Sequence, residues 1–221
     1  MKHIVIDLEM CQVPKSVSKE IYKPRNEIIE IGAVMLDEGY NQISSFKSYV
    51  RPQYGVLTLN ISRLTGIVNE DIHNAPILEE ALIDMINWIS DIEVDIYAWS
   101  ENDWLQLNRE IKHKAIDNDK INSIINETNW IDYQQVFGEK FGYPRKVSLI
   151  DALALTHVFL EGRQHDGLVD AINTARLIET IESHPNYKLP ESYSVGEKGE
   201  NVKFGTYLGD LLNQFSLSVA S

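Results

Sequence analysis

The chain carries two acids, Asp7 and Glu9, at the end of an apolar run close to its N-terminus. Side chains two residues apart in an extended strand point to the same side, so this pair offers two carboxylates to one face. Two more acids, Asp103 and Asp170, stand near the starts of expected helices, and His165 shortly precedes Asp170. Carboxylate ligands without a cysteine cluster select a hard ion, Mg²⁺ or Mn²⁺, over zinc. As a set, these residues indicate a site for a hard divalent cation beside a base that titrates near neutral pH.

Each of these motifs also has a plainer interpretation. An Asp-x-Glu pair at a strand end arises often by chance and is usually solvated, and Asp103 alone can serve to stabilise the N-terminus of a helix. His165 alone is more typical of a surface loop, and the neighbouring Asp166 is the expected N-cap of the last helix. Burying two like charges is costly unless a positive charge neutralises them, so the surroundings of the acids decide between the interpretations.

The hydrophobic pattern predicts a mixed sheet covered by helices. Strands are expected at residues 2–8, 27–36, 43–50, 94–99 and 130–132. Helices are expected at residues 77–89, from 103 onward, and at 133–141, 149–159 and 168–183, with short helical turns near 57–64 and 69–72. Residues 112–129 are rich in Asn, Asp and Lys and yield no assignment. Successive strands followed by alternating strands and helices predict an α/β architecture of three layers, whose strand ends bind ligands.

Composition excludes several classes of protein. The 221 residues are 43% hydrophobic and 24% charged, which is typical of a globular chain. No apolar run approaches the roughly 20 residues that cross a bilayer, and the first residues do not form a secretory signal. With the single cysteine Cys11 no internal disulfide is possible, so we expect a cytoplasmic protein without membrane association. The net charge of −13 argues against sequence-independent adhesion to long nucleic acids, so a polyanion must be held locally.

Five strings occur along the chain in a specific order: IVIDLEM, EIIEIGAV, LTGI, WSENDW and GRQHDGLVDAINTA. As a set they resemble the DEDDh group of 3′-to-5′ exonucleases, which have a ribonuclease-H-like fold. The resemblance covers about residues 3–183. Within the group, the sequence is most similar to the Eri-type RNA exonucleases and their bacterial KapD-like relatives. It departs from them at Met10-Cys11-Gln12, where Eri-type sequences commonly have Ala-Thr-Cys.

The resemblance implies a ribonuclease-H-like three-layer domain over residues 1–183 and an extension of unknown role over residues 184–221. It also implies two Mg²⁺ or Mn²⁺ ions, bridged by the first acid and completed by the other three, with the histidine as general base for the attacking water. The implied metal ligands are Asp7, Glu9, Asp103 and Asp170, and the implied general base is His165. The implied substrate-binding residues are Met10, Leu64, Thr65, Gly66 and Trp99.

The expected activity is metal-dependent release of nucleoside monophosphates from the 3′ end of single-stranded RNA or short oligonucleotides. A DNA exonuclease of the same group stays an alternative, because contacts to a 2′-hydroxyl are invisible in a sequence. A second alternative is a non-catalytic regulatory protein that keeps the fold and docks a protein partner, for example in the control of sporulation.

Two further features bear on substrate binding. A basic loop follows the first strand, and it either covers the phosphates of a single strand or is merely solvated. Its cations are Lys15, Lys19, Lys23 and Arg25. Aromatic residues offer stacking platforms but are more often part of a core. We expect Trp104 in the core, and Trp99 stays open between the two.

Overall fold

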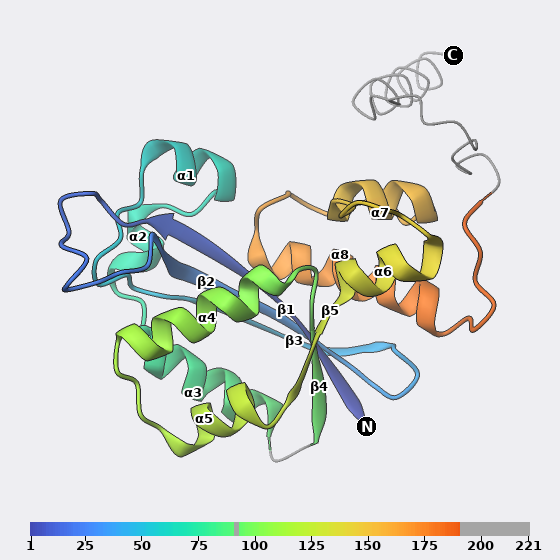
Figure 1. The fold of residues 1–221 in the computed structure, drawn as a ribbon, viewed down its shortest axis with the longest axis horizontal. Helices are drawn as coiled ribbons and strands as arrows, with labels where there is room; N and C mark the ends of the chain where they lie inside the picture. Colours follow the sequence, from blue (N-terminus) through green and yellow to red (C-terminus); the bar gives the residue numbers. More distant parts are fainter. Residues whose placement is uncertain (91–92, 191–221) are drawn as a thin grey trace. The chain divides into compact units, whose positions relative to one another are not determined.

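A five-stranded mixed sheet forms the centre of the structure (Figure 1). The computed structural model describes residues 1–90 and 93–190, and all elements named below lie in the unit Met1–Lys188. In the order β3-β2-β1-β4-β5 the strands span Gln42–Tyr49, Asn26–Leu36, Lys2–Gln12, Val94–Ala98 and Asn129–Asp132. The first three strands along the chain are antiparallel, whereas β4 and β5 run parallel to β1.

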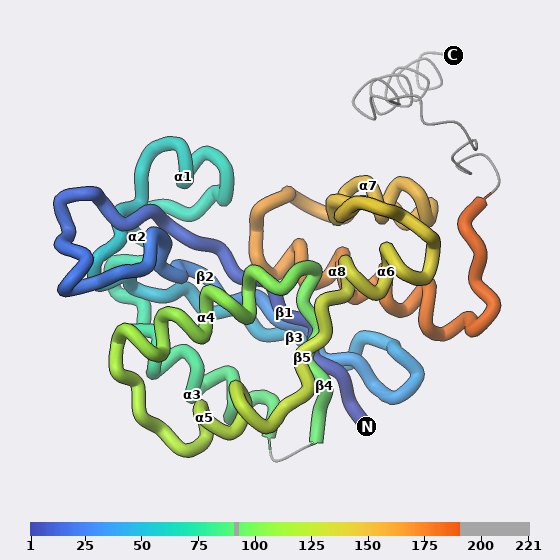
Figure 2. Tube along the Cα trace, viewed as in Figure 1, coloured from blue at the N-terminus to red at the C-terminus, as the bar shows by residue number. Residues whose placement is uncertain are grey.

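Helices cover both faces of this sheet, which confirms the expected three-layer α/β architecture (Figure 2). In the described part of the chain they are α1 Leu59–Thr65, α2 Asn69–His73, α3 Leu78–Ile89, α4 Glu101–His113, α5 Asp119–Asn126, α6 Tyr133–Phe141, α7 Leu149–Thr156 and α8 Gly167–Glu182. The helices α3, α4 and α5 share one hydrophobic core with the sheet. On the other face, α8 packs against β1 and β2, and α7 packs against α8.

The central strand β1 divides its side chains between the two faces. Ile4, Ile6 and Leu8 belong to the core beneath α3, α4 and α5. Because side chains alternate along a strand, Asp7 and Glu9 face the side that α8 covers. The pairing of β1 with β2 is irregular between Glu9 and Met10, because β2 has one extra residue, Ile29, between the partners of these two residues. Glu9 therefore lies directly before this irregularity, on the side of the sheet that α8 covers.

The N-terminus of α8 lies directly on β2. A Cβ atom built on Gly32 would be 2.1 Å from the backbone carbonyl carbon of Gly167 and 2.2 Å from the backbone nitrogen of Leu168. Gly32 pairs with Asp7 across the β1–β2 ladder. Only a residue without a side chain fits at this contact. The first turn of α8 is consequently held at the level of Asp7.

A buried ion cluster joins the start of β2 to the end of α4. The Nζ atom of Lys114 lies 2.7 Å from Oε1 of Glu27 and 2.9 Å from Oε2 of Glu110. Glu27 also accepts backbone N–H bonds from residues 53–55, and Glu110 accepts one from Ile28. These charges are paired with one another and with backbone donors, as buried charges must be.

Several helices differ from the expected ones. The helix α4 begins before Asp103, because the Ser100 hydroxyl caps it by accepting the N–H of Asn102. The unassigned region contains α5, which Asn118 caps. The helix α7 ends at Thr156 rather than at residue 159, because His157 adopts a left-handed conformation with φ of 58°. None of the described helices is long and apolar enough to cross a membrane. Of the expected extension, residues 191–221 lie outside the described residues.

The contact between Gly32 and Gly167 generates a stability prediction. Gly32→Ala should lower the free energy of unfolding by about 1–3 kcal/mol, because the added methyl group must push the backbone of α8 away from β2. Gly138→Ala is the matched control, since a Cβ there meets nothing closer than 3.7 Å within helix α6. That control should be neutral or stabilising by up to about 1 kcal/mol. Urea unfolding followed by circular dichroism measures both, and equal stability of the two variants would contradict the prediction.

Candidate metal centre

Glu9 and Asp7 form the sheet side of a cluster of acids. Glu9 is buried, with 8% of its surface exposed, and Asp7 is half-buried. Within residues 1–90 and 93–190, no hydrogen bond or ion pair reaches either carboxylate. Buried carboxylates in proteins are normally paired or coordinate a metal. These two lack a compensating cation from the described protein.

Asp103 joins the cluster from the other side of β1. The strand β4 ends at Ala98, which pairs with Ile6, so β1 continues beyond it with a free edge. The backbone N–H of Leu8 on this edge donates to Oδ1 of Asp103 at 3.1 Å. Asp103 lies in the first turn of α4 and is buried. The end of the short strand β4 thus creates the place that Asp103 fills.

Asp170 and His165 join the cluster from the start of α8. The backbone N–H of His165 donates to Oδ2 of Asp170 at 2.8 Å. Glu9, His165 and Asp170 each present a possible ligand atom, and these atoms lie within 4.8 Å of one another. Asp166, between the two, caps α8 as expected by accepting the N–H of Val169. His165 is exposed and adopts a left-handed conformation with φ of 61°.

The electrostatics of the cluster reflect this crowding of like charges. Burial raises the pKa of Asp7 well above its usual range, and the charges of Asp103, Glu9 and Asp170 raise it further. Burial, with Asp170 and other acids, raises the pKa of Glu9 to about 8. Burial raises the pKa of Asp103 to about 7, although the hydrogen bond from Leu8 opposes the shift. An all-oxygen donor set that resists ionisation suits a hard divalent cation, which replaces the protons.

One further acid lies beside the cluster and was missed from the sequence. Glu30 pairs with Glu9 across the β1–β2 ladder and is fully buried. Its Oε1 atom accepts the N–H of Leu168 at 3.2 Å and lies 3.1 Å from Nζ of Lys47. A charged residue inside the apolar string EIIEIGAV was the indication available, because such a residue is buried only with a partner.

The predicted substrate-binding turn lies beside the loop that carries His165. Leu64 is 46% exposed, whereas the Thr65 side chain accepts the N–H of Ile67 and fixes the turn. Gly66 is left-handed, with φ of 83°. Arg163 packs against Gly66 and donates from Nη2 to the carbonyl oxygen of Arg63. The turn and the histidine loop are therefore adjacent, while the function of the turn stays a prediction.

The other two predicted substrate-binding residues offer little free surface. Met10 packs against the edge of the core beneath α3, α4 and α5, away from the face that bears Glu9. Trp99 is 8% exposed and lies among aromatic rings, with its ring centroid 5.9 Å from that of Phe137 and 6.4 Å from that of Tyr133. The Trp99 side chain is thus mainly part of the core, and its contact with substrate stays a prediction.

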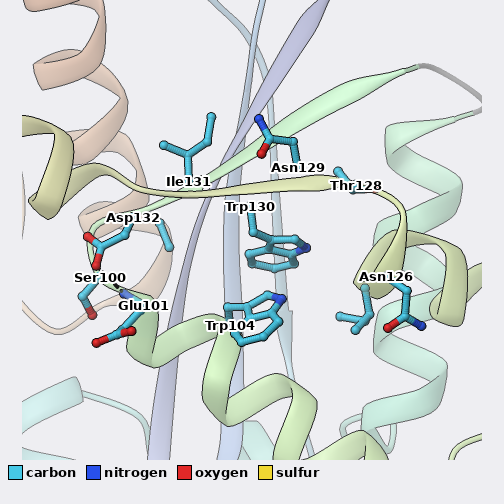
Figure 3. A pocket seen from close by; sticks show the side chains of 11 residues that line it. Ser100, Glu101, Trp104, Asn126, Thr128, Asn129, Trp130, Ile131 and Asp132 are labelled. Atoms are coloured by element: carbon cyan, nitrogen blue, oxygen red, sulfur yellow. Dashed lines mark hydrogen bonds between the residues drawn. The ribbon is translucent and has the colours of Figure 1, made fainter.

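Trp104, which we expected in the core, instead lines a hollow of about 360 Å³ between α4, α5 and β5 (Figure 3). Trp130 of β5 lies next to it in this hollow, and both side chains are half-buried. This hollow is separate from the acid cluster. Asp103 does not line it, although Asp103 directly precedes Trp104 in the chain. Successive residues on a helix point about 100° apart, which sends the two side chains in different directions.

A second hollow, of about 490 Å³, lies beyond the end of β1. It is lined in part by Lys15 and Arg25 of the basic loop, together with Gln12 at the end of the strand. Both cations are exposed and have no acid beside them within the described residues. Lys19 and Lys23 do not line this hollow. The loop therefore presents two of its four cations at a concave surface three residues beyond Glu9.

Comparison with known proteins gives a consistent family. The family model described as Exonuclease (RNase_T) matches residues 4–178. The protein called ERI1 exoribonuclease 2 of Danio rerio is 31% identical over 203 residues, which cover 80% of this chain and 34% of that protein. The human protein of the same name is 31% identical over 176 residues, covering 68% of this chain and 24% of the relative. The chain therefore spans about a third or less of the length of these curated relatives.

Solved structures share the fold. The nuclease domain of 3'hExo, described as a DEDDh family member bound to rAMP, superposes with a TM-score of 0.69 at 22% identity, covering 86% of this chain and 96% of that domain. A 3'-exonuclease described in the 3'-end specific recognition of a histone mRNA stem-loop superposes with a TM-score of 0.70 at 21% identity, covering 80% of each chain. These likenesses establish the ribonuclease-H-like fold of the chain.

The unpaired acids predict that stability depends jointly on pH and on a divalent cation. The pKa values of these carboxyl groups are higher in the folded protein than in the unfolded chain. At a pH between the two values, the folded protein keeps the proton and the unfolded chain has released it. Without metal, the free energy of unfolding should therefore fall as pH rises from about 5 to about 8, by about 1.4 kcal/mol for each tenfold difference in proton affinity. Mn²⁺ should remove part of this loss, because the cation takes the place of the protons.

Urea unfolding at several pH values, with Mn²⁺ or with a chelator, measures this effect. Glu9→Gln is the control variant, because the neutral amide removes one proton-binding group and one ligand while keeping the shape of the side chain. The difference made by Mn²⁺ at pH 8 should shrink in this variant. A wild-type pH dependence that is the same with and without Mn²⁺ would refute a cation site at these acids.

Proposed function

The chain belongs to the DEDDh exonuclease family, and from this premise we propose that it is a divalent-metal-dependent 3′-to-5′ exonuclease that acts on single-stranded RNA or short oligonucleotides. The observation that carries the proposal is the convergence of acids from β1, α4 and α8 beside His165, with no cation of the described residues paired with Asp7 or Glu9. The names of the curated relatives, which are exoribonucleases, support RNA as the substrate class. The products are nucleoside monophosphates.

The carboxylates of the cluster would hold the metal ions. Asp7, whose carboxylate interacts electrostatically with the other three acids, would be shared by the two ions, and those three acids would hold the ions directly or through water. These three are Glu9, Asp103 and Asp170. Two divalent ions, when bound, would supply charge stabilisation for both the attacking and the departing oxygen of phosphodiester hydrolysis.

His165 acts as the general base. Its imidazole takes the proton of the attacking water, and its exposure gives the base access to the substrate side of the cluster. The backbone N–H of His165 donates a hydrogen bond to the carboxylate of Asp170, which is a proposed metal ligand. This bond fixes the backbone of the general base next to the metal site. Base and ligands are thereby held in one geometry, which hydrolysis at a fixed phosphodiester requires.

Removing the imidazole of His165 tests the general-base role separately from metal binding. His165→Ala should lower turnover by about two to four orders of magnitude, because the proton of the attacking water has no acceptor. Mn²⁺ binding measured by calorimetry should stay close to that of the unmodified protein. Asp7→Asn, in contrast, should lose metal binding and activity together. The assay is release of mononucleotides from labelled single strands, with RNA and DNA of the same sequence compared.

The control for this series is His184→Ala, which removes an exposed imidazole at the far end of α8 and should keep full turnover. Normal turnover of the His165 variant would dismiss the general-base role. Equal rates on RNA and DNA would remove the RNA preference from the proposal, and no release from either strand by the unmodified protein would refute the exonuclease.

The two cations that line the hollow at the basic loop bind phosphates of the substrate, which a chain with a net negative charge otherwise repels. Charge reversal of Lys15 and Arg25 together should raise KM for a single strand about tenfold or more at low salt and leave kcat nearly unchanged, because the lost contacts are to phosphates away from the cleaved bond. Charge reversal of Lys112 and Lys120, which are exposed on or near α4 and α5, makes the same change in net charge. Equal KM values for the two double variants would show that the basic loop is merely solvated.

A further inference from the structure

Lys47 of β3 contacts two acids that belong to different elements. Its Nζ atom lies 3.1 Å from Oε1 of Glu30 on β2 and 2.9 Å from Oδ2 of Asp166, the N-cap of α8. The sheet register explains the reach of this side chain. Lys47 pairs with Gly32, and Gly32 pairs with Asp7, so the three residues form one row across β3, β2 and β1. The missing side chain at Gly32 leaves α8 close enough for the ammonium group to bridge sheet and helix.

The acids that Lys47 joins also hold the start of α8 in other ways. Oε1 of Glu30 accepts the N–H of Leu168 at 3.2 Å, and Oδ1 of Asp166 accepts the N–H of Val169 at 3.2 Å. The ammonium group therefore connects a carboxylate anchored in the sheet to the carboxylate that caps the helix. Two backbone donors of the first helical turn are fixed by the same pair of acids.

This bridge ends one residue from the proposed general base. Asp166 follows His165, whose left-handed backbone is held on its other side by the N–H bond to Asp170. Left-handed conformations of residues other than glycine persist only when surrounding contacts enforce them. The backbone of His165 is thus fixed between the bridge at Asp166 and the carboxylate of Asp170.

The burial of its Glu30 end distinguishes the bridge from an ordinary surface ion pair. The Glu30 side chain is fully buried, and no residue in the described part of the chain forms a hydrogen bond with its Oε2 atom. Lys47 is the only cation that contacts this carboxylate within the described residues. An exposed ion pair contributes little, but the loss of one partner of a buried charge has large effects on its surroundings.

We propose that Lys47 is a positioning residue for the reaction, an inference that rests on the proposed function. Through Glu30 and Asp166, Lys47 holds the His165 loop so that the imidazole faces Glu9 and Asp170. Lys47 touches neither substrate nor metal in this role. Its charge and its length both matter, because the ammonium group must reach two carboxylates at once. The bridge acts on turnover and leaves the affinity for substrate and metal unchanged.

The test compares Lys47→Met, Lys47→Arg and Lys140→Met in the full chain. Lys140 is a matched control, because it pairs with Glu182 at the other end of α8 and its side chain is 27% exposed, against 28% for Lys47. Lys47→Met should lower kcat about tenfold to 100-fold with KM and Mn²⁺ affinity unchanged. Lys47→Arg should restore most of the turnover, and Lys140→Met should keep it.

A second readout does not depend on catalysis. The N–H of His165 is bound to Asp170, so its hydrogen exchange reports the position of the loop directly. In Lys47→Met this exchange should become about tenfold faster or more, while the amide of the buried Leu177 within α8 keeps its protection. Should Lys47→Met fail to fold, Asp166→Asn removes the charge opposite Lys47 and keeps an N-cap residue, and the same two changes are expected.

Each outcome decides the proposal. Wild-type kcat and wild-type exchange of the His165 amide in Lys47→Met would overturn it, as would an equal loss of kcat in Lys140→Met or no recovery in Lys47→Arg. If the unmodified protein releases no nucleotides, the proposed function fails, and the exchange of the His165 amide still decides whether the bridge holds the loop.

Discussion

The backbone contact between Gly32 and Gly167 is the constraint on which the rest of the site depends. A side chain at Gly32 would overlap the first turn of α8, so this one position sets how closely helix and sheet approach. Gly32 pairs with Asp7 on one side and with Lys47 on the other. The close approach brings the acids of β1, the helix acid Asp170 and the bridging lysine together. A packing feature without any charge of its own thereby assembles a charged centre.

Two groups of buried acids in the same protein are treated in opposite ways. Glu27 and Glu110 share Lys114 and accept backbone or side-chain donors, so their charges are compensated within the fold. Asp7 and Glu9 have no such partners among the described residues, and their pKa values are raised. The fold compensates the first group of acids but leaves Asp7 and Glu9 uncompensated. Their repulsion and their loss of hydration therefore lower the stability of the folded protein when both are ionised. A divalent cation bound between these acids would remove that loss of stability, and metal binding would then be linked to stability.

The sequence was sufficient to predict the architecture and to select the four acids that the structure brings together, whose role as metal ligands stays a prediction. It was insufficient to predict which residues surround those acids. Asp7 and Glu9 were found because strand alternation is a local rule, and the start of α8 was found because Asp166 is a typical cap. Glu30 was missed because its importance comes from strand pairing, which no local pattern contains. Trp104 was assigned to the core because apolar spacing does not tell which face of α4 meets the short strand β5. The partners of Lys47 likewise depend on register and on the distance between β2 and α8.

The loop that carries His165 shows how an exposed segment can hold a reactive group in place. The residue is left-handed, a conformation that costs a non-glycine residue on the order of 1 kcal/mol or more. Contacts in three directions oppose that cost: Arg163 reaches the last turn of α1, Asp166 reaches Lys47 on the sheet, and the N–H of His165 reaches Asp170. Because each contact ends on a different element, the loop cannot relax without breaking at least one of them. Rigidity at this exposed position therefore comes from tertiary contacts with the sheet and the helices, and the loop needs no core of its own.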